Sequence, residues 1–284
     1  MPETAVTLGA LIPAATERLR VAGVPEPRRE AIRIWADLAG SEISEVALGQ
    51  NRVVDPRAVD KFEEAVDRRG RGEPLAHSTG ITGFRHLSLT IDARALIPRP
   101  ETEGLVDLML QRVTSGRILD VGTGSGCLAL SLAQEGGYSE VVAVDCSADA
   151  LSLARLNQNA TSLPITLIRG HLCQPFRPAA FDALISNPPY LTAAEYRTLD
   201  PAVRDWEPAV ALVSGADGMA ATTALLQHAR DVLAPGGWLA LELDCSRAAA
   251  VAAQANALGW AEVSVHMDLF GRERYLLAQR SNTR

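Results

Sequence analysis

The sequence contains little of what metal centres, disulfide frameworks and membrane spans are made from. Its four cysteines are far apart and form no C-x-x-C pair, and its five histidines are scattered, so we expect no bound metal. No window approaches the apolar run that a membrane-spanning helix requires. We expect no secretory leader, because the first residues show no charged-then-apolar pattern. Free thiols without a leader are typical of the reducing cytoplasm, where we expect the protein to be located.

Positive charge is also scarce. Lys61 is the only lysine, and 27 basic side chains face 34 acidic ones, which gives a formal net charge of −7. Such a surface repels phosphate backbones and anionic membranes, so we expect no direct nucleic-acid partner and no membrane partner. The apolar fraction of 47% and the charged fraction of 21% are typical of a soluble globular protein, which we expect to be a monomer.

The spacing of apolar residues divides the chain into three parts. Residues 1–72 place apolar side chains at steps of three and four, with proline and glycine between the segments, which predicts a small helical bundle. Residues 73–98 include the alternating LSLTID and are otherwise broken by glycine and proline, which predicts a β-hairpin linker. Residues 99–284 open with a helix whose first turn suits Pro100 and then alternate strand-like and helix-like segments.

The third part predicts an α/β fold. Short apolar strands separated by amphipathic helices indicate a mostly parallel sheet that is covered by helices on both faces. The seven predicted strands are residues 117–121, 141–145, 165–168, 181–186, 238–243, 261–266 and 275–280.

A glycine-rich turn follows the first of these strands. Gly122, Gly124 and Gly126 alternate with Thr123 and Ser125 at the start of a helix. Glycine there allows a sharp turn and lets a ligand approach backbone N–H groups that we expect to point outward. The spacing G-x-G-x-G differs from the dinucleotide motif G-x-G-x-x-G, and the Lys-Ser/Thr pair of a phosphate loop is missing.

Two carboxylates flank this turn. Asp120 ends the strand before the glycines, where it would repel a pyrophosphate but could hold an ammonium group. Asp145 ends the next strand, 19 residues after Gly126, where a carboxylate commonly receives ribose hydroxyls. An amino group and a ribose without a phosphate describe S-adenosylmethionine, so we predict it as the cofactor and S-adenosylhomocysteine as its product. His171 and Leu172, after the third strand, fall where such folds contact the adenine.

Residues 186–190, SNPPY, end the fourth predicted strand. Pro188 and Pro189 have fixed φ angles and no N–H, and a residue before proline is held extended. The segment therefore becomes a rigid rim that displays the Asn187 amide and carbonyl oxygens outward. Parallel sheets bind ligands at this end of their strands. We predict that Asn187, Pro188, Pro189 and Tyr190 bind the substrate and that Asn187 also faces the cofactor.

This rim suits methyl transfer to a weakly nucleophilic –NH2 nitrogen that is conjugated to a carbonyl or a ring. If the Asn187 side-chain oxygen and the Pro188 carbonyl each accept one N–H, the nitrogen is held with its lone pair toward the methylsulfonium. Both acceptors strengthen as positive charge develops on that nitrogen. Tyr190 can stack on the flat group. We predict Asn187, Pro188 and Tyr190 as catalytic residues, but they do not distinguish an amide from a nucleobase.

Together, ILDVGTGSG, VVAVD and SNPPY resemble the class I S-adenosylmethionine-dependent methyltransferases, which have a Rossmann-like fold. The surrounding stretches narrow this resemblance to the release-factor glutamine methyltransferases, from about residue 73 to residue 280. These stretches are GEPLAHSTG, IPRPETE, DWEPAVALVSGADGMA, LAPGGWLALEL and DLFGRERYLLAQR.

The resemblance implies a substrate and a role for each part of the chain. The substrate would be the glutamine side chain in the Gly-Gly-Gln motif of class I peptide-chain release factors, and the product N5-methylglutamine, which modulates translation termination. Asn187 and Pro188 would accept the amide hydrogens, and Tyr190 would pack on the amide. Residues 1–72 would form a substrate-docking domain, and residues 99–284 the methyltransferase domain.

Two other functions stay open at this point. A nucleic-acid amino methyltransferase that acts on adenine N6 or guanine N2 shares the logic of SNPPY, but it predicts a basic channel for phosphates. A non-catalytic module could bind the cofactor or a translation partner. Such a module has no need of Asn187 beside two cofactor-binding acids, Asp120 and Asp145.

Overall fold

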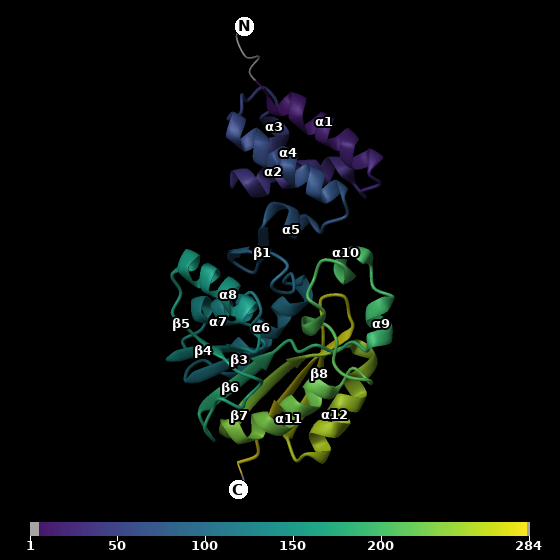
Figure 1. Cartoon of the computed structure of the whole chain (residues 1–284). Coiled ribbons are helices and arrows are strands. Elements are labelled where there is room, and N and C mark those ends of the chain that lie inside the picture. Colours follow the sequence, from purple (N-terminus) through teal and green to yellow (C-terminus); the bar gives the residue numbers. More distant parts are fainter. Residues whose placement is uncertain (1–5, 283–284) are drawn as a thin grey trace. The chain divides into compact units, whose positions relative to one another are not determined.

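The computed structural model describes residues 6–282, which fold into two compact units. One unit holds the described residues up to Ile81 together with Asp200–Trp206. The other holds Thr82–Leu199 and the described residues from Glu207 onward. A short segment from far along the chain thus belongs to the N-terminal unit. Figure 1 labels most of the elements of both units.

The N-terminal unit is helical, and its local sequence explains where its helices begin and pack. Asp55 caps α4, because its carboxylate accepts the N–H of Arg57 at 2.7 Å, and Pro56 occupies the first turn. Trp35 and Phe62 meet edge to face in the apolar core, 5.4 Å apart between ring centroids. The helices are α1 (Leu8–Val21), α2 (Pro27–Ala39), α3 (Ile43–Leu48), α4 (Pro56–Gly70), α5 (Leu75–Thr79) and α10 (Pro201–Arg204).

The predicted β-hairpin is present, but it fills only part of the linker expected over residues 73–98. β1 (Ile81–Phe84) and β2 (Leu87–Thr90) pair as a two-stranded sheet. Arg85 lies in the turn between them with a φ of 52°, and its guanidinium pairs with Glu135 at 2.6 Å. The helix α5 precedes the hairpin within the same linker, and the sequence analysis does not predict it.

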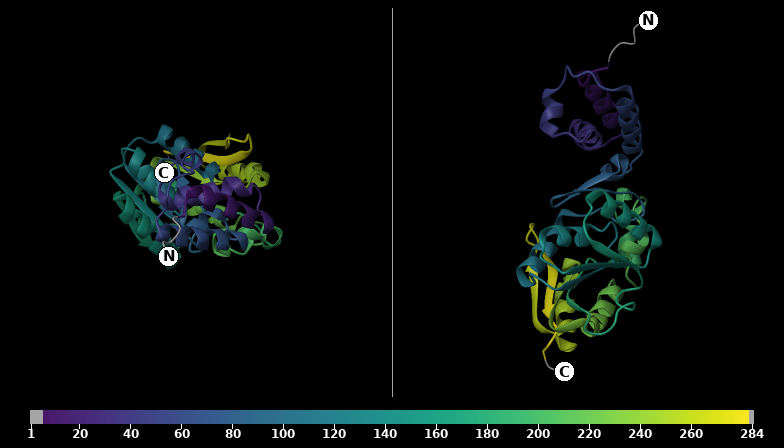
Figure 2. Two further views of the ribbon diagram at one scale, coloured as in Figure 1. Left: turned by 90° about the horizontal axis from the view of Figure 1, so that it is seen from above. Right: turned by 90° about the vertical axis from the view of Figure 1, so that its left-hand side faces the viewer.

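A seven-stranded sheet forms the centre of the second unit, in the order β5-β4-β3-β6-β7-β9-β8. Neighbouring strands from β5 to β7 are parallel, whereas β9 runs antiparallel to both β7 and β8. The yellow C-terminal strands lie at one edge of the sheet in Figure 2. The predicted mostly parallel sheet is confirmed. Its strands are β3 (Arg117–Val121), β4 (Glu140–Asp145), β5 (Ile165–Arg169), β6 (Phe181–Ser186), β7 (Leu233–Glu242), β8 (Ala261–Met267) and β9 (Glu273–Gln279).

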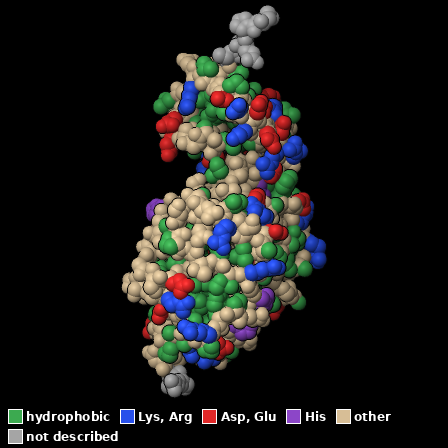
Figure 3. Space-filling view, turned by 60° about the vertical axis from the view of Figure 1, so that its left-hand side comes forward, with side chains coloured by type: hydrophobic (Ala, Val, Ile, Leu, Met, Phe, Trp, Pro, Cys, Tyr) green, Lys and Arg blue, Asp and Glu red, His purple; other side chains and the backbone are tan. Residues whose placement is uncertain are grey.

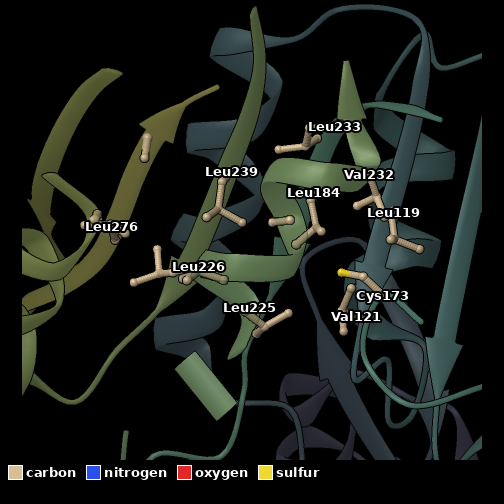
Figure 4. Packing of buried hydrophobic residues seen from close by; sticks show 14 of the residues in the cluster. Leu119, Val121, Cys173, Leu184, Leu225, Leu226, Val232, Leu233, Leu239 and Leu276 are labelled. Carbon is tan, nitrogen blue, oxygen red and sulfur yellow. The ribbon is translucent and has the colours of Figure 1, made fainter. Parts of the chain in front are cut away.

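Helices cover both faces of this sheet, because its central strands are apolar on both sides. In β3, Leu119 faces one apolar cluster, which is shown in Figure 4, and Ile118 faces the other. α11 and α12 pack on the first face, and α6, α7 and the hairpin pack on the second. The remaining elements are α6 (Pro100–Arg112), α7 (Cys127–Glu135), α8 (Ala148–Thr161), α9 (Ala193–Arg197), α11 (Ala220–Val232), α12 (Ala248–Ala257) and the 3₁₀ turns η1 (Ala209–Ala211) and η2 (Cys245–Arg247). Between residues 6 and 282, no helix is long and apolar enough to cross a membrane.

A buried asparagine ties the hairpin to the glycine-rich turn. Asn157 of α8 is fully buried. Its Oδ1 accepts the N–H of Thr90 at 2.8 Å, and its Nδ2 donates to the carbonyl oxygens of Thr90 at 3.0 Å and Ser125 at 2.9 Å. One side chain thus satisfies backbone groups of β2 and of the turn after β3. The conformation of that turn therefore depends on α8 and the hairpin as well as on its own glycines.

We expect Asn157→Ala to lower the free energy of unfolding by roughly 2–4 kcal/mol, because three hydrogen bonds are lost and buried backbone groups are left without partners. Denaturant unfolding of the full chain measures this change. The matched control is Asn256→Ala, since Asn256 is an exposed helical residue that donates only to the Ala252 carbonyl. Equal effects of the two substitutions would contradict this role of Asn157.

Candidate active site

The centre of the sheet creates a crevice where its strand order reverses. From β3 the chain goes to β4 and β5 on one side and then returns to β6 on the other side. The carboxyl ends of β3 and β6 are held together by Ser186, whose Oγ donates to the Val121 carbonyl at 2.7 Å. Open α/β sheets bind their ligands at such a point. The residue after Val121 is Gly122, and the residue after Ser186 is Asn187, so the two predicted motifs meet there.

A cavity of about 450 Å³ opens at this point. Its volume is within the range of small-molecule sites in proteins. Among the described residues, Asp120, Gly126, Pro188 and Tyr190 are predicted site residues that do not line its wall. The predicted residues that do line the wall are Gly122, Thr123, Gly124, Ser125, Asp145, His171, Leu172, Asn187 and Pro189.

The glycine-rich turn differs from the sequence expectation in one respect. Gly122, Gly124 and Gly126 all have positive φ angles, of 73°, 55° and 86°, which explains why glycine occupies these positions. However, the amides of Gly122 and Thr123 both donate to the Val144 carbonyl, at 2.8 and 3.1 Å, and the amide of Gly126 donates to the Thr123 carbonyl at 2.8 Å. These N–H groups do not point outward to a ligand. The turn therefore lines the cavity, but these N–H groups are not available to bind a phosphate.

Asp120 lies beneath this turn and is fully buried. Its Oδ2 accepts the Thr123 hydroxyl at 2.6 Å and the Ala129 N–H at 3.2 Å. Its Oδ1 is buried without a hydrogen-bond partner among residues 6–282. Burial, with a smaller contribution from the charge of Asp145, raises the pKa of Asp120 to about 7. An unpartnered carboxylate oxygen of this kind fits a cationic hydrogen-bond donor such as an ammonium group.

Asp145 ends β4 at the cavity wall, as predicted. Its Oδ2 accepts the Gly124 N–H at 3.0 Å, and its Oδ1 accepts the Ser147 N–H at 2.9 Å. These two bonds fix the plane of the carboxylate. Each oxygen keeps a further lone pair, so the pair of oxygens can accept two adjacent hydroxyl groups. The arrangement fits the ribose of a nucleoside.

The two residues predicted to contact adenine also lie at the wall. His171 and Leu172 follow β5, where the amide of Gly170 donates to the Asp145 carbonyl at 3.0 Å. Leu172 has a φ of 50°, a left-handed conformation that costs energy in a residue other than glycine. Such strain is often found at binding sites. The position of His171 and Leu172 beside Asp145 fits a base attached to the ribose.

The segment SNPPY places Asn187 at the cavity. A second segment, which follows η1, lines the cavity beside it. Asn187 and Pro189 line the cavity, whereas Pro188 is buried and Tyr190 is half-buried. Burial raises the pKa of Tyr190 to about 12, so its phenol is neutral at physiological pH. After the prolines, the amide of Leu191 donates to the Leu212 carbonyl at 2.9 Å, and the segment that follows η1 becomes part of the cavity wall.

Two buried residues beside Asn187 have no role in the sequence predictions, and one of them, Thr102, also lines the cavity. The Asn187 Nδ2 donates to the Thr102 hydroxyl at 3.1 Å, and that hydroxyl donates to the Glu242 Oε2 at 2.6 Å. Thr102 belongs to IPRPETE and Glu242 to LAPGGWLALEL, two of the stretches that carry the family resemblance. Thr102 and Glu242 are far apart in the sequence, so no local sequence pattern predicts that they are in contact.

Glu207 and Arg99 form a second pair that has no role in the sequence predictions. Glu207 is buried, accepts the Ile97 N–H at 2.9 Å and pairs with the guanidinium of Arg99. Glu207 thereby holds the segment that begins at Pro208 against IPRPETE. Both Arg99 and Pro208 line the cavity. In the described part of the chain, no group of three or more histidine, cysteine or acidic side chains could hold a metal ion.

Comparisons with known proteins assign the fold first. The model of the Methyltransferase small domain family matches residues 100–202, and that of the PrmC N-terminal domain matches residues 10–80. A methyltransferase from Pyrococcus furiosus is similar in structure, with a TM-score of 0.52 and 21% identity over 68% of this chain and 88% of that one. A ribosomal protein L11 methylase from Lactobacillus delbrueckii has a TM-score of 0.50 and 19% identity over 70% of this chain and 95% of that one. The fold is that of a methyltransferase.

Relatives in sequence narrow the class. A release factor glutamine methyltransferase from Deinococcus radiodurans is 40% identical and covers 95% of this chain and 98% of its own length. The proteins of the same name from Moorella thermoacetica and Nitratidesulfovibrio vulgaris are 37% and 36% identical, each over 97% of this chain and over 99% and 96% of their own lengths. The chain belongs to the release factor glutamine methyltransferase family.

The buried Asp120 makes the stability of the ligand-free protein depend on pH. Its pKa is raised from an ordinary value of 3.8 to about 7, so ionisation opposes folding between these values. We expect Asp120→Asn, which cannot ionise, to gain stability relative to the wild type as the pH rises from 5 to 8. The gain should be roughly 2 kcal/mol. Denaturant unfolding at the two pH values measures it, and a difference that does not change with pH would contradict this assignment.

Proposed function

We propose that this protein transfers a methyl group from S-adenosylmethionine to the side-chain nitrogen N5 of a glutamine. The glutamine is that of the Gly-Gly-Gln motif in class I peptide-chain release factors. The observation that carries the proposal is Asn187, whose amide is held by Thr102 at the wall of a cavity that also presents Asp145. The name shared by the relatives supports the choice of substrate.

The residues present fit S-adenosylmethionine. The unpartnered Oδ1 of Asp120, beneath the wall, would attract its ammonium group, and Asp145 at the wall would accept its ribose hydroxyls. His171 and Leu172 would flank the adenine, and residues 122–126 would shape the wall along it. When bound, S-adenosylmethionine supplies a methyl group on a positively charged sulfur.

The rim makes the glutamine nitrogen reactive by holding it. An amide nitrogen is a weak nucleophile, because its lone pair is shared with the carbonyl. Asn187 Oδ1 and the Pro188 carbonyl oxygen each accept one N–H, which fixes the lone pair toward the methyl group. Positive charge develops on the nitrogen during transfer, so both acceptors bind the transition state more tightly than the ground state. Fixed orientation supplies a further part of the rate.

Tyr190 and solvent account for the remaining parts of the reaction. Tyr190 stays neutral and packs on the flat amide, which helps to exclude water. The methyl group would pass from the sulfur to the nitrogen, and the nitrogen, made acidic by its new bond, would lose one proton to water. No side chain has to remove a proton before the transfer. S-adenosylhomocysteine leaves as the second product.

A nucleic-acid amino methyltransferase is the alternative that uses the same rim. An enzyme of that kind needs a patch of basic side chains to bind the phosphates of the nucleic acid. On the face drawn in Figure 3, basic and acidic side chains are mixed. The net charge of −7 also opposes phosphate binding. Both observations favour a protein substrate.

We further propose that the helical unit is a docking surface for the release factor. It corresponds to the predicted docking domain of residues 1–72 and to the match with the PrmC N-terminal domain over residues 10–80. Its surface carries charges of both signs, including the exposed ion pair of Arg20 with Glu17 at 2.6 Å. A monomer in the cytoplasm, where release factors act, fits this role.

Incubation with labelled S-adenosylmethionine and a panel of a release factor, tRNA, rRNA and DNA tests the function. We expect label only on the glutamine of the release factor, located by mass spectrometry of peptides. We expect Asn187→Ala to lower kcat at least about hundredfold, because one acceptor of the transition state is lost. Its affinity for the cofactor should change little.

A short Gly-Gly-Gln peptide serves as the comparison substrate. It should have a higher KM than the intact factor if the helical unit contributes to docking. Label on a nucleic acid, or near-normal turnover by Asn187→Ala, would refute the proposal.

The role of Asp145 gives a different phenotype. We expect Asp145→Ala to weaken binding of S-adenosylmethionine about tenfold to hundredfold, because two hydrogen bonds to the ribose are lost. Calorimetric titration measures the affinity. Asp149→Ala is a suitable control, since Asp149 lies in the first turn of α8 and does not belong to the cavity wall. Unchanged affinity of Asp145→Ala would remove the ribose assignment.

A further inference from the structure

The side-chain amide of Asn187 can take two orientations beside Thr102. One presents Oδ1, an acceptor, to the substrate, and the other presents Nδ2, a donor. With Nδ2 toward Thr102, the Oδ1 is available to accept an N–H from the substrate. With the amide turned by half a rotation, an NH2 group would face the substrate nitrogen instead. Two donors would then meet, and the nitrogen could not be held. A methyltransferase of this kind therefore needs a device that fixes the sense of the amide.

The chain Asn187–Thr102–Glu242 supplies such a device. The Thr102 hydroxyl has one proton, and an ionised carboxylate can only accept. With Glu242 Oε2 at 2.6 Å, that proton is committed to Glu242. The hydroxyl oxygen can then only accept, so its partner at 3.1 Å has to be the Asn187 Nδ2–H. The opposite sense would place two acceptors against each other.

Burial makes this constraint strong. Thr102 and Glu242 are each 2% exposed, so bulk water does not supply substitute partners. Thr102 lies in the first turn of α6, and Glu242 ends β7. The position of the Thr102 hydroxyl relative to the Glu242 carboxylate is therefore set by the packing of α6 beside β7. Neither Thr102 nor Glu242 has to touch the substrate.

We propose that Thr102 and Glu242 are positioning residues that fix the sense of the Asn187 amide, so that Oδ1 meets the substrate nitrogen. The inference rests on the proposed function and adds two residues to it. It also makes turnover depend on the ionisation of Glu242. A protonated Glu242 can donate to the Thr102 oxygen, which frees the hydroxyl proton and removes the constraint on the amide.

Some of the groups around Glu242 raise its pKa and others lower it. Burial raises the pKa of Glu242 to about 7, the Thr102 hydroxyl and the arginines lower it, and Glu101 raises it. The ionised form that fixes the amide therefore dominates above neutral pH. The charged and titratable groups that face Glu242 are Arg99 and Glu101 around the start of α6, Cys127 of α7, Tyr190 after β6, and Arg274 and Tyr275 of β9.

The test compares Thr102→Val with Thr102→Ser in the full-length enzyme. Valine keeps the shape of threonine and loses the hydroxyl, whereas serine keeps the hydroxyl. With saturating S-adenosylmethionine and a Gly-Gly-Gln peptide, we expect Thr102→Val to lower kcat about tenfold to hundredfold and Thr102→Ser to stay within about threefold of the wild type. Thr222→Val is the matched control, because Thr222 is equally buried and does not line the cavity.

The pH profile gives the readout that a merely structural role would not change. We expect kcat of the wild type to fall as the pH drops below about 7, and kcat of Glu242→Gln to be lower and independent of pH over the same range. Saturating cofactor separates this effect from the titration of Asp120, which acts on cofactor binding. Glu242→Gln also keeps the test decisive if Thr102→Val does not fold.

The outcomes separate this inference from the proposed function. If the wild type labels no glutamine, the proposed function fails. If the wild type labels glutamine but Thr102→Val matches it in kcat, the positioning role is wrong and the function stands. Equal losses in Thr102→Val and Thr102→Ser would also overturn the role, because the hydroxyl would then not be the group that acts.

Discussion

The site depends on the parallel pairing of β3 with β6 at the reversal of strand order. That pairing aligns Asp120 with Ile185, and the hydrogen bond from Ser186 to the Val121 carbonyl closes it at the carboxyl end. The residues that follow Val121 and Ser186 are Gly122 and Asn187, which both line the cavity. A shift of β6 by one residue along β3 would turn the side chains of β6 to the wrong faces of the sheet and separate the two motifs.

Three carboxylates lie at or beneath the wall of the crevice and would favour a cation over an anion. Asp145 stands at the wall, while Asp120 and Glu242 lie buried beneath it with pKa values raised to about 7 by burial. Taking a carboxylate out of water costs free energy, and a bound ammonium or sulfonium recovers part of that cost. The same acids oppose a phosphate, which agrees with a glycine-rich turn in which the amides of Gly122, Thr123, Gly124 and Gly126 donate to groups of the protein.

Local patterns were sufficient to predict the parts of the site that follow strand ends. The sheet, the glycine-rich turn, Asp145 at the wall and Asn187 at its rim are each encoded within a few residues. Thr102 and Glu242 were not predicted, because they are 140 residues apart and meet only when α6 packs beside β7. The outward direction of the turn amides was predicted wrongly, since the spacing of glycines does not reveal that the Val144 carbonyl captures two of those N–H groups.

The most direct measurement is a crystal structure of the protein with S-adenosylhomocysteine and a glutamine peptide. We expect the glutamine side-chain nitrogen to lie at hydrogen-bonding distance, about 2.7–3.2 Å, from both Asn187 Oδ1 and the Pro188 carbonyl oxygen, and to face the sulfur. A glutamine nitrogen bound by neither oxygen, or an Asn187 side chain turned away from the cavity, would contradict it.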